Sequence, residues 1–307
     1  MSVTFDATRD GSSNGWRRWA LLASIALIGI LGRHALYSLL KIALSNAEYS
    51  HILLVPPIVL AFVFLEQRHE KAHGSSRLLG VVCVLLGIAV WLCARMVPAA
   101  FELTLEISTV VLWIWATVFL VYGSNLFRAA LFPMLFLLLL IPWPAPMVER
   151  LTELLQAGST AAAFWMFKMA GIAVTRQGFV LSLPSIDIEV AKECSGIRST
   201  VMLFVTTLVL GQWYLRSTWR KVLLALLVFL IGILRNGLRI FILSVLGTYV
   251  NEGWLDGNLH HRGGAAFFVL GLAMIVVLLW LLKRGEAAPA GPAGITRSLE
   301  TFRTKPT

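Results

Sequence analysis

The chain has 307 residues, of which 58% are hydrophobic and only 14% are charged, and its mean hydropathy is +0.80. This composition excludes a soluble globular protein, because several apolar runs approach or exceed the roughly 18 residues needed to cross a bilayer. The net charge of +10 does not indicate nucleic-acid binding, since the basic residues lie mainly in short connections between apolar runs. That distribution is typical of membrane topology.

Eight apolar segments predict an all-α polytopic membrane protein with about eight transmembrane helices. We expect a cytoplasmic tail at residues 1–16, one transmembrane domain at 17–284, and a disordered tail rich in Ala, Pro and Gly at 285–307. No cleavable signal peptide is expected, because the first apolar run lacks a small-residue cleavage site. The predicted spans cover about residues 19–40, 51–65, 78–97, 101–122, 129–143, 197–215, 222–250 and 264–282.

Lysine and arginine predict the orientation of these spans. With residues 1–16 in the cytoplasm, every basic connection falls on the cytoplasmic side, in agreement with the positive-inside rule. Both termini are then cytoplasmic, and residues 144–195 and 251–263 lie on the outer face. The basic positions are Arg68, Lys71, Arg77, Arg128, Arg216, Arg220, Lys221, Lys283 and Arg284.

Residues 151–172 are helical in pattern and moderately apolar, but Glu153 and Lys168 make the segment costly as a span. We interpret it as a short amphipathic or re-entrant helix on the outer face; if it crossed the membrane, Cys194 would face inward. Residues 174–190 then alternate in polarity and contain glycine and proline, which predicts a strand or short hairpin before the cysteine.

Cys194 lies at the border between this polar segment and the sixth predicted span, beside Lys192 and Arg198. Nearby positive charge or a helix N-terminus lowers the pKa of a thiol and so increases its reactive thiolate form. Cys194 is therefore a candidate nucleophile, and an inert structural cysteine is the alternative. The other two cysteines, Cys83 and Cys93, lie within an apolar run. Without a CxxC pair, neither a disulfide framework nor a metal site is predicted.

Arg235 and Arg239 lie deep in the seventh span, at the spacing that places two residues on one helical face. Ionisable residues inside a span are costly, so a functional role is the first hypothesis. The alternative, a structural ion pair with Glu102 or Glu106 of the fourth span, stays open. Arg239 is about 18 residues from the cytoplasmic end, or roughly 27 Å at 1.5 Å per residue, which places it near the level of Cys194.

His260 and His261 occupy the outer loop before the eighth span. A histidine can transfer a proton near neutral pH, although two adjacent loop histidines can also be merely solvated. The predicted topology brings Cys194, Arg239 and His260 to one face of the membrane from three different spans. His51 begins a span on the same side and is either a further site residue or an interfacial histidine.

Three motifs in this order resemble those of the exosortase/archaeosortase family of integral-membrane cysteine transpeptidases. They are Cys194 to Ser199, Asn236 to Arg239 in a late span, and His260 to Gly264 before the last span. The segment from Tyr49 to His51, followed by two prolines, is similar to an early segment of the family. Ala265 departs from the aromatic residue that often follows the glycine. The resemblance covers about residues 45 to 282.

The resemblance implies that Cys194 is the nucleophile, Arg239 its electrostatic partner and His260 the proton donor. It implies no metal and no cofactor, and it carries no role to Arg235, which has no counterpart in the family motif. Residues that would bind substrate or support the site are His51, Arg198, Asn236 and His261.

The implied reaction is attack on a backbone carbonyl near the C-terminus of an exported protein, which gives a thioester that an amine acceptor or water resolves. The substrate would carry a short Pro-Glu-Pro-like motif, a transmembrane helix and a basic tail. The resemblance thus implies an enzyme of the bacterial inner membrane, in contact with membrane lipids, whose active site faces the periplasm. Surface anchoring or exopolysaccharide would be the associated process.

Other functions remain open at the level of the residues. A transporter could use Arg235, Arg239 and Glu106 as a substrate or proton path, and a lipid-linked glycan ligase or polymerase could bind a diphosphate with the outer arginines and histidines. Neither needs Cys194. A membrane thiol oxidoreductase would need a close cysteine pair, which the sequence lacks.

Overall fold

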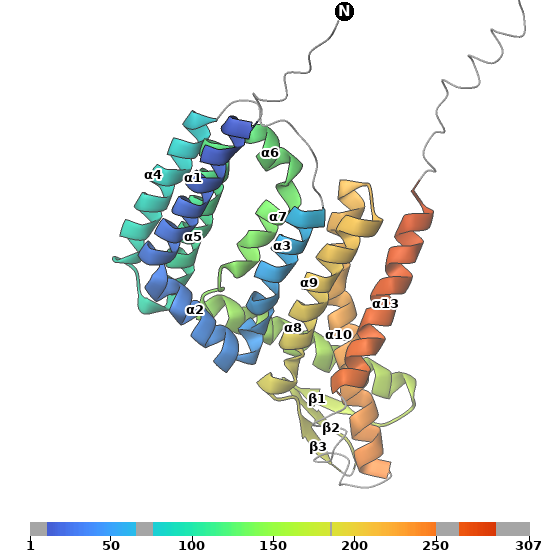
Figure 1. The fold of residues 1–307 in the computed structure, drawn as a ribbon. Helices are drawn as coiled ribbons and strands as arrows, with labels where there is room; N and C mark the ends of the chain where they lie inside the picture. The colour runs from blue at the N-terminus through green and yellow to red at the C-terminus, as the bar shows by residue number, and fades with distance from the viewer. Residues whose placement is uncertain (1–10, 66–75, 185, 250–263, 287–307) are drawn as a thin grey trace, which may run out of the picture. The chain divides into compact units, whose positions relative to one another are not determined.

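The computed structural model describes residues 11–65, 76–184, 186–249 and 264–286, which are almost entirely helical (Figure 1). The chain divides into two compact units, Met1–Gln156 and Ala157–Thr307, with α8 running through the division. Many large apolar side chains on the helix surfaces are exposed, such as Leu78 and Trp165, as expected for helices that face lipid.

The first unit consists of a series of helices joined by short connections. Its elements are α1 (Gly11–Leu31), α2 (Arg33–Ser45), η1 (Ala47–Leu54), α3 (Val55–Leu65), α4 (Arg77–Ala94), α5 (Ala99–Val121), α6 (Ser124–Ala129), α7 (Leu131–Phe136), η2 (Leu137–Leu140) and the first part of α8 (Ala145–Met169).

Glycines on α4 allow it to approach α5 closely. A Cβ at Gly80 would lie 2.5 Å from Cγ of Leu120, and one at Gly87 would lie 2.5 Å from Nε1 of Trp113. Small residues are the usual means by which membrane helices pack closely, because lipid supplies no hydrophobic force between them. The hydroxyl of Thr109 on α5 lies 3.3 Å from the carbonyl oxygen of Gly87 on α4 and 3.0 Å from that of Leu105 on α5.

The first predicted span, residues 19–40, is not one straight helix. Residues 15–31 and 33–45 form two helices that meet at an angle of 73° at Gly32. Polar Arg33 and His34 follow the break, which explains why the helix does not continue straight through it. A Cβ at Gly32 would lie 3.1 Å from Cγ2 of Val110, so the bend also sits tightly against α5.

The fifth predicted span, residues 129–143, ends at a bend. Residues 131–140 and α8 meet at an angle of 96°, and the prolines of residues 142–146 lie at the bend. The carbonyl oxygens of this segment accept hydrogen bonds from other parts of the unit: Thr104 donates to Pro142 at 2.8 Å, and Tyr49 donates to Trp143 at 3.0 Å. α8 starts earlier than the predicted helix at 151–172, because proline is tolerated in a first helical turn.

Five helical segments of the described residues are long and apolar enough to cross a membrane, and up to seven if each bent pair counts as one span. The all-α polytopic class is confirmed, whereas the predicted number of eight spans is not. α9 (Ile197–Tyr214), which matches the sixth predicted span in its bounds, is not among the five. Its threonines, together with Arg198 and Gln212, make it less apolar than α4, α5 and α13 (Gly264–Arg284).

The second unit contains the remainder of α8, a small sheet and three long helices (Figure 1). Its further elements are β1 (Thr175–Gln177), β2 (Val180–Ser182), β3 (Asp187–Glu189), η3 (Lys192–Ser195), α9, α10 (Thr218–Tyr249) and α13 (Gly264–Arg284). α9, α10 and α13 pack around a buried cluster of Leu203, Val228, Ile231 and Ile275.

The three strands form an antiparallel sheet in the order β1-β2-β3. Leu181 of β2 pairs with Arg176 and Ile188 and is completely buried. It packs in one cluster with Phe167 of α8 and Ile240 of α10. The predicted strand pattern at 174–190 is confirmed, with three strands. Because the sheet is anchored to α8 and α10, it holds the start of η3, which follows β3, close to the middle of α10.

At the end of α10 opposite this sheet, the three long helices are joined by polar contacts. The carboxylate of Glu286 accepts hydrogen bonds from the backbone N–H groups of Arg216 and Ser217, at 2.9 and 3.0 Å. Arg220 donates to the carbonyl oxygens of Leu282, at 2.8 Å, and Gly285. The N–H of Ser217, followed by that of Arg216 and the charge of Arg220, lowers the pKa of Glu286.

Candidate active site

The cysteine motif forms a turn between η3 and α9. η3 contains the backbone of Cys194, and α9 begins at Ile197. Gly196, between them, has a φ of +76°, a conformation that glycine adopts without the penalty paid by other residues. The motif therefore places Cys194 directly before a sharp turn into a long helix.

Hydrogen bonds within the motif fix this turn. The hydroxyls of Ser199 and Thr200 both donate to the carbonyl oxygen of Gly196, each at 2.9 Å. The N–H of Ile197 lies 3.4 Å from the hydroxyl oxygen of Ser195, a side chain that is only 1% exposed. Hydrogen bonds made by side chains of the motif itself therefore hold the backbone that follows Cys194.

Two residues of α10 pack directly against Gly196. A Cβ at Gly196 would lie 3.0 Å from Oδ1 of Asn236 and 3.1 Å from Nη2 of Arg235. Glycine is therefore required here by space as well as by its backbone conformation. This contact brings the two motifs that sequence analysis identified, Cys194 to Ser199 and Asn236 to Arg239, together at one point.

Arg235 is the most deeply buried charged residue at this point, with 3% of its surface exposed. Its Nη2 donates a 2.6 Å hydrogen bond to the hydroxyl of Ser199. Its aliphatic part lies against α13, where a Cβ at Gly271 would be 3.0 Å from Cδ of Arg235. Arg235 thus connects α10 to the first turn of α9 and to α13.

Within the described residues of the second unit, Arg235 forms no ion pair, and its hydrogen-bond partner is Ser199. In the first unit, Glu106 lies 3.7 Å from Nη2 of Arg95. The family motif carries no role to Arg235, and only its position in an apolar helix indicated a function.

The rest of the second motif extends along α10. Asn236 is 1% exposed, Arg239 is half-buried one turn further along, and Ile240 belongs to the core beneath the sheet. Gly237 faces α8, because a Cβ there would lie 2.6 Å from that of Ala162. Asn236, Gly237 and Ile240 therefore contact three different elements, which fixes the rotation and the height of the helix that carries Arg239.

The other predicted site residues lie in other elements or outside the described residues. Arg198 is exposed in the first turn of α9. His51 belongs to η1 in the first unit, where its Nδ1 lies 3.1 Å from the carbonyl oxygen of Glu48. The side chain of Cys194, and both His260 and His261, lie outside the described residues.

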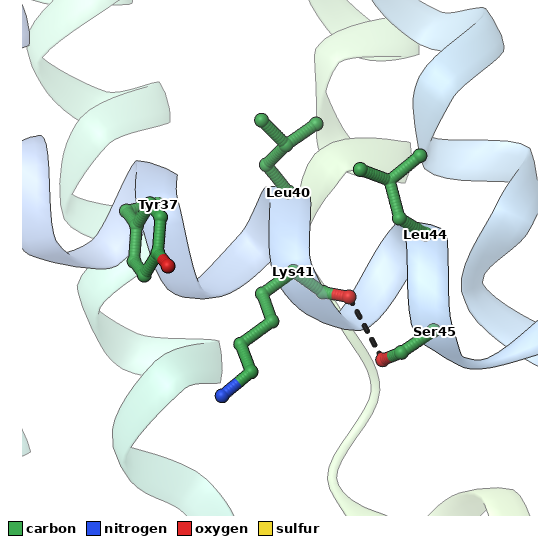
Figure 2. A pocket seen from close by; sticks show the side chains of 5 residues that line it. All are labelled: Tyr37, Leu40, Lys41, Leu44 and Ser45. Atoms are coloured by element: carbon green, nitrogen blue, oxygen red, sulfur yellow. Dashed lines mark hydrogen bonds between the residues drawn. The ribbon is translucent and has the colours of Figure 1, made fainter.

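One hollow of about 360 Å³ lies on α2 in the first unit (Figure 2). All of its lining residues, Tyr37, Leu40, Lys41, Leu44 and Ser45, come from that one helix, and none of them is a predicted site residue. Among the residues that the structure describes, no three His, Cys, Asp or Glu side chains gather as metal ligands would.

Comparison with known families gives one match. Residues 43–277 match the family model described as transmembrane exosortase. The matched region includes η1 with His51, the cysteine motif, the Asn236 to Arg239 motif and the loop histidines. No curated protein and no solved structure matches the chain.

Proposed function

The chain belongs to the transmembrane exosortase family, and we propose that it is a cysteine transpeptidase that cleaves the C-terminal sorting signal of exported proteins. One observation carries the proposal beyond family membership. The turn that follows Cys194 packs directly on Asn236 of the second motif, so two motifs that are distant in sequence meet at Gly196.

In the proposed first step, the thiolate of Cys194 attacks the carbonyl carbon of the scissile peptide bond. The carbonyl oxygen becomes negative, and Arg239, whose guanidinium is always charged, stabilises it. His260 gives a proton to the leaving nitrogen as the C–N bond breaks. The products are a thioester between Cys194 and the N-terminal fragment, and a free amine on the C-terminal fragment.

In the second step, an amine acceptor attacks the thioester carbonyl, its proton passes to His260, and the thiolate leaves. The result is transpeptidation; if water attacks instead, the result is hydrolysis. Either route regenerates the thiolate of Cys194, so the cycle balances without any redox partner.

The proposed substrate is an exported protein with a short C-terminal motif, a transmembrane helix and a basic tail. Retention of the basic tail on the cytoplasmic side would hold the motif at the outer face of a bacterial inner membrane. Arg198 is exposed at the entrance to α9 and can contact a peptide there. His51 and His261 are the other proposed substrate contacts, and buried Asn236 supports the turn.

Co-expression of the protein with such a substrate tests this function. Cys194→Ala should abolish cleavage, whereas Cys93→Ala is a matched control, because Cys93 is an exposed cysteine on α4 and should be dispensable. Normal cleavage by Cys194→Ala would reject the peptidase proposal. It would favour the two functions that need no thiol, transport or lipid-linked glycan ligation.

A further inference from the structure

Arg235 has a buried charge that the proposed mechanism does not use. It is 3% exposed, and its Nε has no hydrogen-bond partner among the described residues. No carboxylate of the described residues of the second unit forms an ion pair with it. A buried cation is costly, and inside a membrane protein such a residue points to function.

The geometry directs this charge at the turn that follows Cys194. Nη2 of Arg235 donates to Ser199 at 2.6 Å and lies 3.1 Å from the Cβ position of Gly196. Gly196 comes two residues after Cys194 in the chain. On the other side, the contact with Gly271 of α13 leaves the arginine stem little room to move away.

Arg235 differs in its burial from the charged groups of the surrounding elements whose side chains the structure describes; the side chain of Glu193 in η3 lies outside them. Lys192 of η3, Arg198 of α9 and Glu189 of β3 are exposed, and Arg239 of α10 is half-buried. The only charged residues of α13 among the described residues, Lys283 and Arg284, lie in its last turn. Exposed charges are screened by salt, whereas buried charges are screened much less.

We propose that Arg235 is a positioning residue for Cys194: it holds the Gly196 to Ser199 turn through Ser199, and its buried charge favours the thiolate of Cys194. The consequence for peptide cleavage rests on the proposed function. The effect on the thiol does not, since it is present before any substrate binds.

The test measures the rate at which iodoacetamide alkylates Cys194, as a function of pH, in the full-length protein in detergent. Cys83→Ala and Cys93→Ala leave Cys194 as the only thiol of the chain. In this background Arg235→Gln should raise the midpoint of the profile by about one pH unit or more, and Arg235→Lys should retain most of the low midpoint. An unchanged midpoint in folded Arg235→Gln would overturn the proposal.

Arg198→Gln is the matched control, because Arg198 is in the same motif but exposed. Its shift should be smaller than that of Arg235→Gln and should disappear in 1 M salt, where the screening length is about 3 Å. Ser199→Ala removes the hydrogen bond and keeps the charge, so it should leave the midpoint near that of the parent. A large rise of the alkylation midpoint in Ser199→Ala would show that the conformation of the turn, and not the charge of Arg235, controls the reactivity of the Cys194 thiol.

If Arg235→Gln does not fold, the proposal is tested by the alkylation profile of the parent protein, which carries Cys83→Ala and Cys93→Ala, at low and high salt. The proposal predicts a midpoint below the ordinary thiol value of about 8.5 that changes little between low and high salt. A midpoint that returns to the ordinary value in 1 M salt would assign the effect to surface cations and contradict the proposal.

The two proposals fail in different ways. A shifted alkylation profile in a protein that cleaves no sorting substrate would leave the role of Arg235 intact and reject the proposed function. Normal cleavage by an Arg235→Gln variant with an unchanged alkylation profile would reject the role of Arg235 and leave the proposed function intact.

Discussion

The guanidinium of Arg235 donates a 2.6 Å hydrogen bond to the hydroxyl of Ser199, and this bond joins the middle of α10 to the first turn of α9. Ser199 in turn donates to the carbonyl of Gly196. A chain of two hydrogen bonds therefore leads from a buried charge to the turn that begins directly after Ser195.

Gly196→Ala should disrupt the site. The new Cβ would meet Asn236 at 3.0 Å and Arg235 at 3.1 Å, and the φ of +76° would add about 1–2 kcal/mol of backbone strain. We expect loss of cleavage and a lower unfolding temperature in detergent. Gly178→Ala is the control, because its φ is +62° but nothing lies within 4 Å of its Cβ position. Equal effects of the two variants would contradict the packing account.

Gly271→Ala should act on the site from α13. Its Cβ would lie 2.9 Å from Cδ1 of Leu203 and 3.0 Å from Cδ of Arg235, so one of these side chains must move. Overpacking of this kind costs about 1–3 kcal/mol. We expect a raised midpoint of Cys194 alkylation together with slower cleavage. Gly29→Ala, on α1 with nothing within 4 Å of its Cβ position, should retain the parent values of both.

Leu181→Ala should detach the sheet from the helices. Leu181 is completely buried among side chains of α8 and α10, and truncation of such a residue costs about 2–5 kcal/mol. The unfolding temperature should fall, and limited proteolysis should become faster at residues 174–190. Thr175→Ala, at an exposed position of β1, should change neither measurement. A stable sheet in Leu181→Ala would show that the cluster does not anchor it.

Glu286 should make stability depend on pH at the opposite end of α10. The N–H of Ser217 lowers the pKa of this carboxyl, so its stabilising contribution is present above the ordinary glutamate pKa and is lost as the pH falls through the lowered value. Wild type should therefore unfold at a higher temperature than Glu286→Gln at pH 7. The two curves should converge in acid, and a constant difference down to low pH would contradict this assignment.

The long helices were predictable because each is a run of apolar residues of membrane length. α4, α5, α10 and α13 lie within a few residues of their predicted bounds. The bend at Gly32 was not predictable, because its 73° angle depends on how the helix meets α5 and not only on local polarity. The sheet was predictable from alternation, but the pairing that makes it three-stranded depends on a contact with α8 and α10.

The site was predictable in its motifs but not in its contacts. Asn236 and the cysteine motif were identified from residue types and spacing, and the structure brings them together at Gly196. Arg235 was identified as a costly residue with either a functional or an ion-pairing role, but nothing in its local sequence indicates that Ser199 lies opposite to it. Such a partner follows from the rotation of α10, which its contacts with α8, α9 and α13 determine.

The most direct test of the central claim is the intact mass of the enzyme, trapped in acid during turnover of a sorting substrate. The account predicts an adduct with the mass of the N-terminal fragment on Cys194, released by hydroxylamine as a thioester must be. Substrate cleavage by the wild-type enzyme without such an adduct, together with undiminished cleavage by Cys194→Ala, would contradict it.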